Sequence, residues 1–159
     1  MPTAIVYTAG DATRPSGADN RVIVHVCNDE GGWGKGFVVA ISKRWPEPEA
    51  RYREWYRERG DNDFGLGVVQ FVKVENSLWV ANLVGQRGVR SVQGVPPIRY
   101  EAVAEGLGRV ARFATEHNAS VHMPRIGCGL AGGNWETIEP LITKELCEQS
   151  LSVTVYDFA

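Results

Sequence analysis

The segment 123–135, MPRIGCGLAGGNW, decides the fold because it joins a predicted strand to a predicted helix through a glycine-rich loop. Residues 119–123 are predicted to form the strand, and residues 135–147 have apolar side chains at helical spacing. Four glycines within residues 127–133 allow positive φ and a close approach of the backbone to a ligand. Backbone N–H groups at such a junction are unpaired, so the loop is expected to bind phosphate. A flexible turn without a ligand is the alternative.

Outside this segment, predicted strands and helices alternate through the second half of the chain. The pattern predicts an α/β fold in a single domain, residues 1–159, with a mixed central β-sheet flanked by helices on both faces. Ligands of such sheets bind beyond the carboxyl ends of the strands. Strands are expected at 3–8, 22–27, 68–74, 78–84, 119–123 and 151–156, and helices at 37–44, 49–59, 98–117 and 135–147.

Composition narrows the function classes. The chain of 159 residues is 43% apolar and 23% charged, which is typical of a globular protein that needs no disulfide or metal to fold. A net charge of -2 offers no broad basic surface, so generic nucleic-acid binding is not expected. No signal peptide or membrane-spanning stretch is recognised, which predicts a cytoplasmic protein. Three cysteines and three histidines without metal-ligand spacing predict neither a metal site nor a cofactor.

A second glycine-rich segment, NDEGGWGKGF at 28–37, also lies between a predicted strand and a predicted helix. Two such loops in one small domain suggest a diphosphate held from two sides by backbone amides. Asn28, Asp29 and Glu30 are placed to accept hydrogen bonds from ribose hydroxyls, and either carboxylate is a candidate to orient a water. Helix capping or solvation is the alternative for these residues, and Lys35 is expected to contact either phosphate or solvent.

Two further residues lie beyond the ends of other strands. Asp11 follows the first strand, where a carboxylate can accept a hydrogen bond from the exocyclic amine of adenine; an Asx turn is the alternative. Phe158 is placed either to stack on a base or to pack on the protein.

Cys27 and Cys128 lack a histidine partner on their own loops and are expected to be packing residues, and His25 is expected to be an interior histidine.

These segments together resemble the macrodomain family, whose members bind ADP-ribose. The resemblance covers nearly the whole chain and lies in GDAT at 10–13, HVCND at 25–29, GGWGKGF at 31–37, LVGQ at 83–86, residues 124–135 and VTVY at 153–156. It is greatest to the branch that contains the terminal ADP-ribose glycohydrolase and the yeast-type ADP-ribose 1''-phosphate phosphatase.

The resemblance implies a site for ADP-ribose and for ADP-ribosylated proteins. Asp11 is then expected to meet adenine, the two glycine-rich loops to hold the diphosphate and distal ribose, and Asn28 and Asp29 to face that ribose. The ligand-binding residues implied are Asp11, Ala12, Gly31, Gly32, Trp33, Gly34, Gly36, Phe37, Ile126, Gly127, Cys128, Gly129, Leu130, Ala131, Gly132 and Phe158.

The chain departs from this branch at the catalytic positions. The acidic residue of the glycohydrolase falls on Ala131, and its nucleophilic lysine falls on or beside Gly85 and Gln86, so a lysyl-adduct mechanism has no support. A water held against the distal ribose is the remaining hypothesis, with Asp29, Gln86 and Asn28 as the catalytic candidates. The function predicted is removal of ADP-ribose from Glu or Asp side chains; the alternatives are an ADP-ribose 1''-phosphate phosphatase and a reader without turnover.

Overall fold

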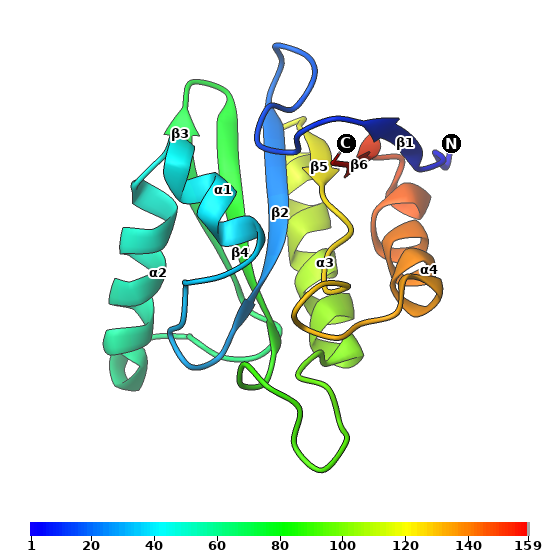
Figure 1. Ribbon diagram of the computed structural model, residues 1–159. Coiled ribbons are helices and arrows are strands. Elements are labelled where there is room, and N and C mark those ends of the chain that lie inside the picture. The colour runs from blue at the N-terminus through cyan, green and yellow to red at the C-terminus, as the bar shows by residue number, and fades with distance from the viewer. Residues whose placement is uncertain (159) are drawn as a thin grey trace.

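The computed structural model, which describes residues 1–158, has a six-stranded sheet between two layers of helices (Figure 1). The strand order is β1-β6-β5-β2-β4-β3. All neighbouring strands are parallel except β3 and β4, which form an antiparallel hairpin. The strands are β1 (Val6–Ala9), β2 (Arg21–Asn28), β3 (Val69–Glu75), β4 (Leu78–Gln86), β5 (Ser120–Met123) and β6 (Val153–Asp157).

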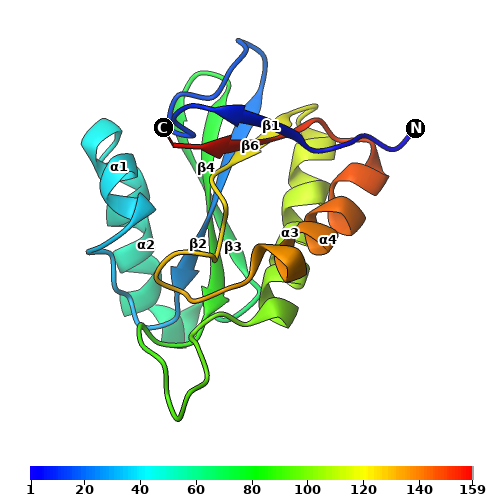
Figure 2. The ribbon, with the colours of Figure 1, turned by 45° about the vertical axis from the view of Figure 1, so that its right-hand side comes forward.

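Helices cover both faces of the sheet, which confirms the predicted fold class. One layer contains α1 (Phe37–Arg44) and α2 (Glu47–Arg57), and the other contains α3 (Tyr100–Glu116) and α4 (Trp135–Glu145) (Figure 2). Two short 3-10 turns span Arg59–Asp61 and Cys147–Gln149. Within residues 1–158, no helix is both long enough and apolar enough to cross a membrane.

Strand β2 is apolar over most of its length because both of its faces are covered. Val22 and Val24 are fully buried in the core beneath α3 and α4, whereas Ile23 is fully buried in the core beneath α1 and α2. Burial of each such side chain contributes roughly 1.5–3 kcal/mol to folding. The consecutive apolar residues 22–24 are therefore the pattern expected of a central parallel strand.

Most element boundaries agree with the sequence prediction, and the larger differences have local causes. The predicted helix at 98–117 starts at Tyr100, because Arg99 is extended and its amide donates to the Gly85 carbonyl at 2.8 Å. The predicted first strand begins at Val6 rather than at residue 3, since pairing with β6 starts there.

The parallel strands all have their carboxyl ends at the same edge of the sheet. The segments that follow these strands, at residues 10–20, 29–36, 87–99 and 124–134, contain most of the residues predicted to bind a ligand. This edge is therefore where the candidate site is found.

Candidate functional site

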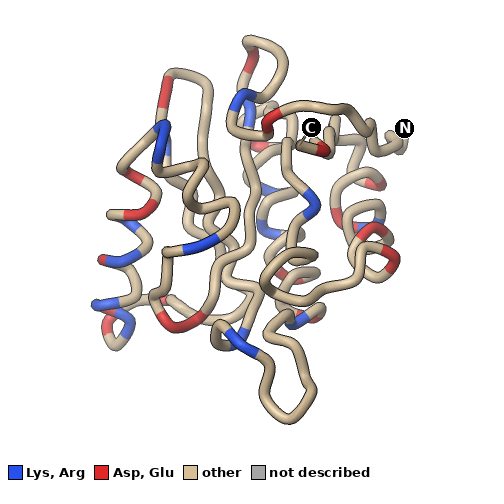
Figure 3. Tube along the Cα trace, viewed as in Figure 1, with Lys and Arg blue, Asp and Glu red and all other residues tan. Residues whose placement is uncertain are grey.

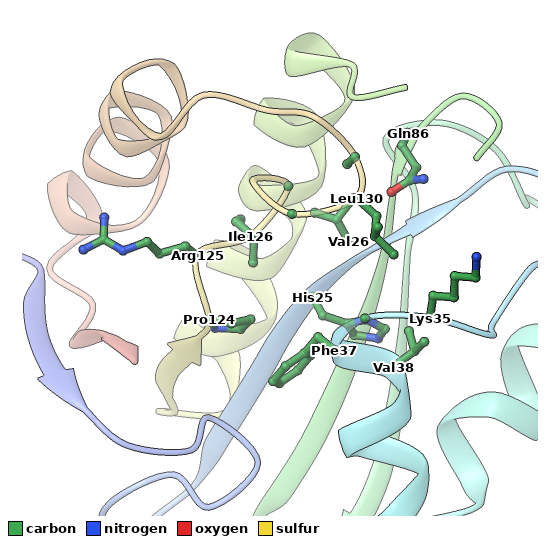
Figure 4. A pocket seen from close by; sticks show the side chains of 14 residues that line it. His25, Val26, Lys35, Phe37, Val38, Gln86, Pro124, Arg125, Ile126 and Leu130 are labelled. Atoms are coloured by element: carbon green, nitrogen blue, oxygen red, sulfur yellow. The ribbon is translucent and has the colours of Figure 1, made fainter. Parts of the chain in front are cut away.

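Three adjoining cavities run along the carboxyl edge of the sheet. The inner cleft, of about 200 Å³, lies between the start of α1 and the loop after β5 (Figure 4). The distal cavity, of about 460 Å³, shares Val26, Lys35, Val38, Gln86 and Leu130 with the inner cleft. The proximal cavity, of about 740 Å³, is lined by Asp11, Phe158 and nine other residues and shares Gly36 with the inner cleft. The three form one elongated depression.

We call residues 28–37 the first glycine loop, and one side chain organises it. The Asn28 Oδ1 accepts hydrogen bonds from the amides of Glu30 (2.8 Å) and Gly32 (3.0 Å), and its Nδ2 donates to the Gly32 carbonyl (2.9 Å). The Tyr52 hydroxyl donates to the Asn28 carbonyl at 2.6 Å, and Arg53 donates to the Gly31 carbonyl at 3.1 Å. Asn28 therefore fixes the shape of this loop as well as lining the distal cavity.

The first glycine loop ends at an uncapped helix N-terminus. Gly36 precedes α1 with a φ of 86°, and no side chain caps the first turn. Phe37 and Val38 line the inner cleft, and within the described chain their amides have no hydrogen-bond acceptor. Unpaired amides at the positive end of a helix dipole favour an anion.

We call residues 124–134 the second glycine loop, and backbone contacts hold it. The Gly133 amide donates to the Gly127 carbonyl at 2.7 Å, and the Ala131 carbonyl accepts from the Ile98 amide at 3.0 Å. The amides of Gly129, Leu130 and Ala131, which line the cleft, have no acceptor within residues 1–158. This loop thus presents a second set of donors to an anion.

The start of α4 differs from the sequence expectation. The Asn134 side chain accepts a hydrogen bond from the Glu136 amide at 2.8 Å, so the first turn of this helix is capped by the protein itself. The free donors of the second glycine loop are therefore in the middle of the loop and not at the helix N-terminus.

Arg125 anchors the beginning of the second glycine loop. Its guanidinium makes a two-pronged ion pair with Asp157 at 2.6 and 3.1 Å. The same group lies over the rings of Tyr7, at 5.2 Å, and Trp135, at 5.0 Å. Such contacts hold the side chain at the outer end of the inner cleft.

Gln86 stands where the inner cleft meets the distal cavity. Its Nε2 donates to the Gly88 carbonyl at 3.0 Å, which leaves its Oε1 free to accept a hydrogen bond. Figure 4 shows Gln86 and Leu130 across the cleft from Lys35. The Asp29 carboxylate instead accepts from the Gly88 amide at 2.8 Å and lines an outer cavity beside the distal cavity. Asn28 and Gln86 thus meet at the distal cavity, and Asp29 does not.

Burial keeps the histidine at the base of the cleft neutral. His25 is buried, and desolvation lowers its pKa to about 4 despite a hydrogen bond of 2.6 Å between its Nε2 and the Asn82 Oδ1. The Cys27 sulfur lies 3.8 Å from the His25 Nε2, yet burial raises the pKa of the thiol. A neutral imidazole beside a protonated thiol is not an activated nucleophile.

Asp11 lies at the far end, in the proximal cavity. Its Oδ1 accepts hydrogen bonds from the Thr13 amide at 2.8 Å and the Thr13 hydroxyl at 2.7 Å. Partial burial acts to raise the pKa of Asp11, but these bonds and the nearby Arg14 and Arg44 outweigh it and lower the pKa. The carboxylate is therefore ionised and both stabilises its turn and faces the cavity.

Most of the residues predicted to bind a ligand line the three cavities. Those outside these linings are Ala12, Gly31, Cys128 and Gly132, with Asp29 in the outer cavity. The sequence reasoning missed Val89 and Arg90, which line the distal cavity. A glycine-containing segment directly after Gln86 was the available signal. Those predicted residues that line the depression are Asp11, Asn28, Gly32, Trp33, Gly34, Gly36, Phe37, Gln86, Ile126, Gly127, Gly129, Leu130, Ala131 and Phe158.

Comparison with solved structures identifies the family. No protein-family model matches the chain. A macrodomain protein from Streptomyces coelicolor is 57% identical, with a TM-score of 0.87 over 98% of this chain and 99% of that one. The chain belongs to the macrodomain family. A Bacteroides thetaiotaomicron protein of unknown function is 57% identical, with a TM-score of 0.93 over 96% of this macrodomain and 97% of that chain.

Curated relatives of this macrodomain differ in length and name. A Chromodomain-helicase-DNA-binding protein 1-like from Danio rerio is 34% identical over 97% of this chain, which spans only 16% of that relative. An ADP-ribose 1''-phosphate phosphatase from Lodderomyces elongisporus is 25% identical over 96% of this chain and 97% of its own. A DNA ADP-ribosyl glycohydrolase from Mycobacterium tuberculosis is 29% identical over 85% of this chain and 36% of its own. The macrodomain is thus related to ADP-ribose hydrolases.

Proposed function

We propose that this macrodomain binds ADP-ribose and removes it from Glu or Asp side chains of modified proteins. The observation that carries the proposal is the order of the three cavities. Asp11 lies at one end, unpaired amides lie in the middle, and the distal cavity lies at the other end, with Asn28 in its lining and Gln86 at its junction with the inner cleft. This order matches the adenine, diphosphate and distal ribose of ADP-ribose. A structural relative from Thermosipho africanus, similar in fold with a TM-score of 0.71, has been solved in complex with ADP-ribose.

The diphosphate is proposed to lie in the inner cleft. Amides of α1 and of the second glycine loop face this cleft from opposite sides, and Lys35 lines it. Neutral amide donors bind an anion without requiring a basic surface, which agrees with the net charge of -2. The adenine amine would then donate to the ionised Asp11 carboxylate, with Phe158 beside the base.

The reaction proposed is direct attack by water. A water held by the free Oε1 of Gln86 and by Asn28 attacks C1'' of the distal ribose. The bond between C1'' and the carrier oxygen breaks, the carrier carboxylate leaves with the bonding electrons, and the proton of the water passes to solvent. Gln86 orients the water but cannot take its proton. The reaction is accelerated because the water is held in position against C1''.

The two positions that differ from the glycohydrolase branch, Gly85 and Ala131, offer no alternative to attack by water. A Cβ on Gly85 would lie 3.0 Å from Val103 and 3.1 Å from Leu83 and Val26, so a longer side chain has little room there. Ala131 lines the inner cleft but has no group that transfers a proton. A carboxylate is a good leaving group, which is why we favour an acyl-linked substrate over an N-glycosidic one.

The test uses a peptide with ADP-ribose linked to glutamate and, separately, ADP-ribose 1''-phosphate. We expect the protein to release ADP-ribose from the peptide, and Gln86→Ala to lower kcat about 100-fold with little change in the dissociation constant for ADP-ribose. Gln70→Ala, at a glutamine outside the three cavities, is the control and should keep the wild-type kcat.

The phosphatase is the second candidate, because a relative with that name matches over nearly the whole length of both chains. Release of ADP-ribose from the 1''-phosphate alone would favour it. If neither substrate is turned over and calorimetry shows ADP-ribose binding, the protein is a reader.

A further inference from the structure

A hairpin projects from the sheet edge next to the distal cavity. We call residues 87–97, between β4 and α3, the rim hairpin (Figures 1 and 2). It borders an outer cavity of about 650 Å³, lined by Asp29, Glu30, Arg87, Gly88, Val89, Arg90 and Val92. None of the proposed contacts to ADP-ribose accounts for this outer cavity.

The rim hairpin has a defined shape. Val92 and Val95 exchange backbone hydrogen bonds of 3.0 and 2.9 Å, and the Arg87 amide donates to the Pro97 carbonyl at 2.8 Å. Gln93 and Gly94 both have positive φ, at 52° and 79°, as in a two-residue hairpin turn. The hairpin is therefore pre-organised and does not depend on a ligand for its fold.

Two of the catalytic candidates fix its position. The Gly88 amide donates to Asp29, and the Gly88 carbonyl accepts from Gln86. A displacement of this glycine would break both hydrogen bonds. The base of the rim hairpin is thus connected by a hydrogen bond to Gln86, which lines the distal cavity.

The hairpin exposes apolar side chains. Val89, Val92 and Val95 are 48, 65 and 53% exposed. Three exposed valines on one rigid hairpin favour contact with another macromolecule, which would remove their side chains from solvent. Val89 and Arg90 line both the distal and the outer cavity, so the two cavities are continuous. The outer cavity therefore adjoins the place proposed for the distal ribose and has room for a group attached to its C1''.

Charge favours a polypeptide over a nucleic acid in this place. Arg87 and Arg90 take part in no ion pair within residues 1–158, and the carboxylates of Asp29 and Glu30 line the same cavity. Figure 3 shows the acidic segment after β2 next to the basic start of the hairpin. A phosphate backbone carries a negative charge on every nucleotide, so some of these charges would meet the two carboxylates. A polypeptide can instead place single acidic side chains opposite the arginines and cover the valines with apolar ones.

We infer that the outer cavity and the rim hairpin bind the polypeptide that carries ADP-ribose, and that they select an acidic segment with an apolar side chain near the modified residue. This inference rests on the proposed function, since it places the carrier beyond the distal ribose. It names the substrate class of the same site.

The experiment compares Arg87→Glu and Val92→Asp, two positions that line the outer cavity and none of the other three. With a glutamate-ADP-ribosylated acidic peptide that contains a leucine, we expect each variant to raise KM about tenfold. The dissociation constant for free ADP-ribose should stay within about twofold. Arg112→Glu and Val6→Asp, at exposed positions on α3 and β1, are the matched controls.

Calorimetry with the same peptide separates this inference from the proposed function. If the wild type binds the modified peptide without turnover, the proposed function fails, but the inference holds when the peptide binds more tightly than ADP-ribose and the two variants lose that difference. Equal affinity for peptide and ADP-ribose in the wild type overturns the inference. So does an equal loss in the controls, or tighter binding of an ADP-ribosylated oligonucleotide than of the peptide.

Discussion

The first and second glycine loops have similar compositions but are held in different ways. Each follows a buried parallel strand and precedes a helix, and each lines the inner cleft. The first takes its shape from hydrogen bonds to one side chain, Asn28. The second takes its shape from close backbone packing around Gly127 and Gly133, where a side chain has no space.

This difference changes what glycine does at each place. In the second loop, a Cβ on Gly127 would lie 2.7 Å from Ile98, and the residue also needs a φ of 72°. In the first loop, a Cβ on Gly31 would overlap the Tyr56 ring, whereas Gly34 has no neighbouring atom within 4 Å, so of these two only Gly34 keeps space open by lacking a side chain. Glycine content alone therefore does not tell a packing requirement from an open ligand site.

The largest effect on stability is expected from Gly133→Val in the second loop. Its Cβ would lie 2.3 Å from the Gly127 carbonyl oxygen, which is backbone and cannot rotate away. We expect a loss of about 3 kcal/mol or more in the free energy of unfolding, measured by urea denaturation. Gly34→Val in the first loop is the matched control and should change it by less than about 1 kcal/mol. Equal unfolding midpoints would contradict the steric account.

Gly129→Val is expected to separate ligand binding from folding. This glycine lines the inner cleft but has no atom within 4 Å of its Cβ position, so the new side chain would enter the space proposed for the diphosphate. We expect ADP-ribose affinity to fall about 100-fold, which corresponds to about 2.7 kcal/mol, by calorimetry. Gly60→Val, also with open space around it, should bind normally. Unchanged affinity for Gly129→Val would remove the diphosphate assignment.

Replacing Asn28 or Asn134 with alanine tests how much side-chain hydrogen bonds stabilise each loop. Asn28→Ala leaves the amides of Glu30 and Gly32 without their acceptor, and we expect a loss of about 2 kcal/mol in stability. Asn134→Ala removes one helix cap and is expected to cost about 1 kcal/mol. Thermal and urea unfolding measure both. The reverse order would show that the first loop does not depend on Asn28.

A pH-dependent effect concerns two buried histidines, one on the strand that precedes each loop. Burial lowers the pKa of His25 on β2 and of His122 on β5 to about 4, and the nearby Arg21 adds to this for His122. The unfolded chain therefore binds more protons between pH 6.5 and 4, so stability is full above pH 6.5 and falls as the pH decreases through this window. We expect about 1.4 kcal/mol of loss per histidine from pH 7.5 to 5.5.

Urea unfolding at these two pH values tests that effect. The His122→Gln variant, compared with wild type at each pH, should lose about half of the pH-dependent change. An unaltered pH dependence would show that His122 is not the group that takes up the proton. The Tyr156 hydroxyl, 2.7 Å from the His122 Nδ1, is the contact through which we expect the neutral ring to be held.

Sequence periodicity predicted the fold well because the strongest signals are local. The apolar run of β2 and the helical spacing of α3 reflect faces that any α/β packing must bury. The glycine-rich loops were also recognised, since glycine spacing is visible in the sequence. Both findings rest on short-range patterns.

The details of the site depend on contacts between distant residues and could not be predicted in the same way. Asp29 is predicted from the sequence to orient a water, but its carboxylate accepts a hydrogen bond from the Gly88 amide, 59 positions away. Val89 and Arg90 resemble ordinary loop residues until the fold places them against the first glycine loop. Which polar group becomes the partner of which amide is decided by tertiary packing.

The anchoring of Arg125 has a consequence for the order of folding. Its partners, Tyr7 on β1, Trp135 on α4 and Asp157 at the end of β6, come from both ends of the described chain. The contact between Arg125 and Tyr7 joins residues far apart in sequence, and such contacts form slowly because the two ends of the intervening chain must first come together. The wall of the cleft that carries the second glycine loop is therefore expected to become ordered late, so that during refolding the ability to bind ADP-ribose should return after most of the helical structure.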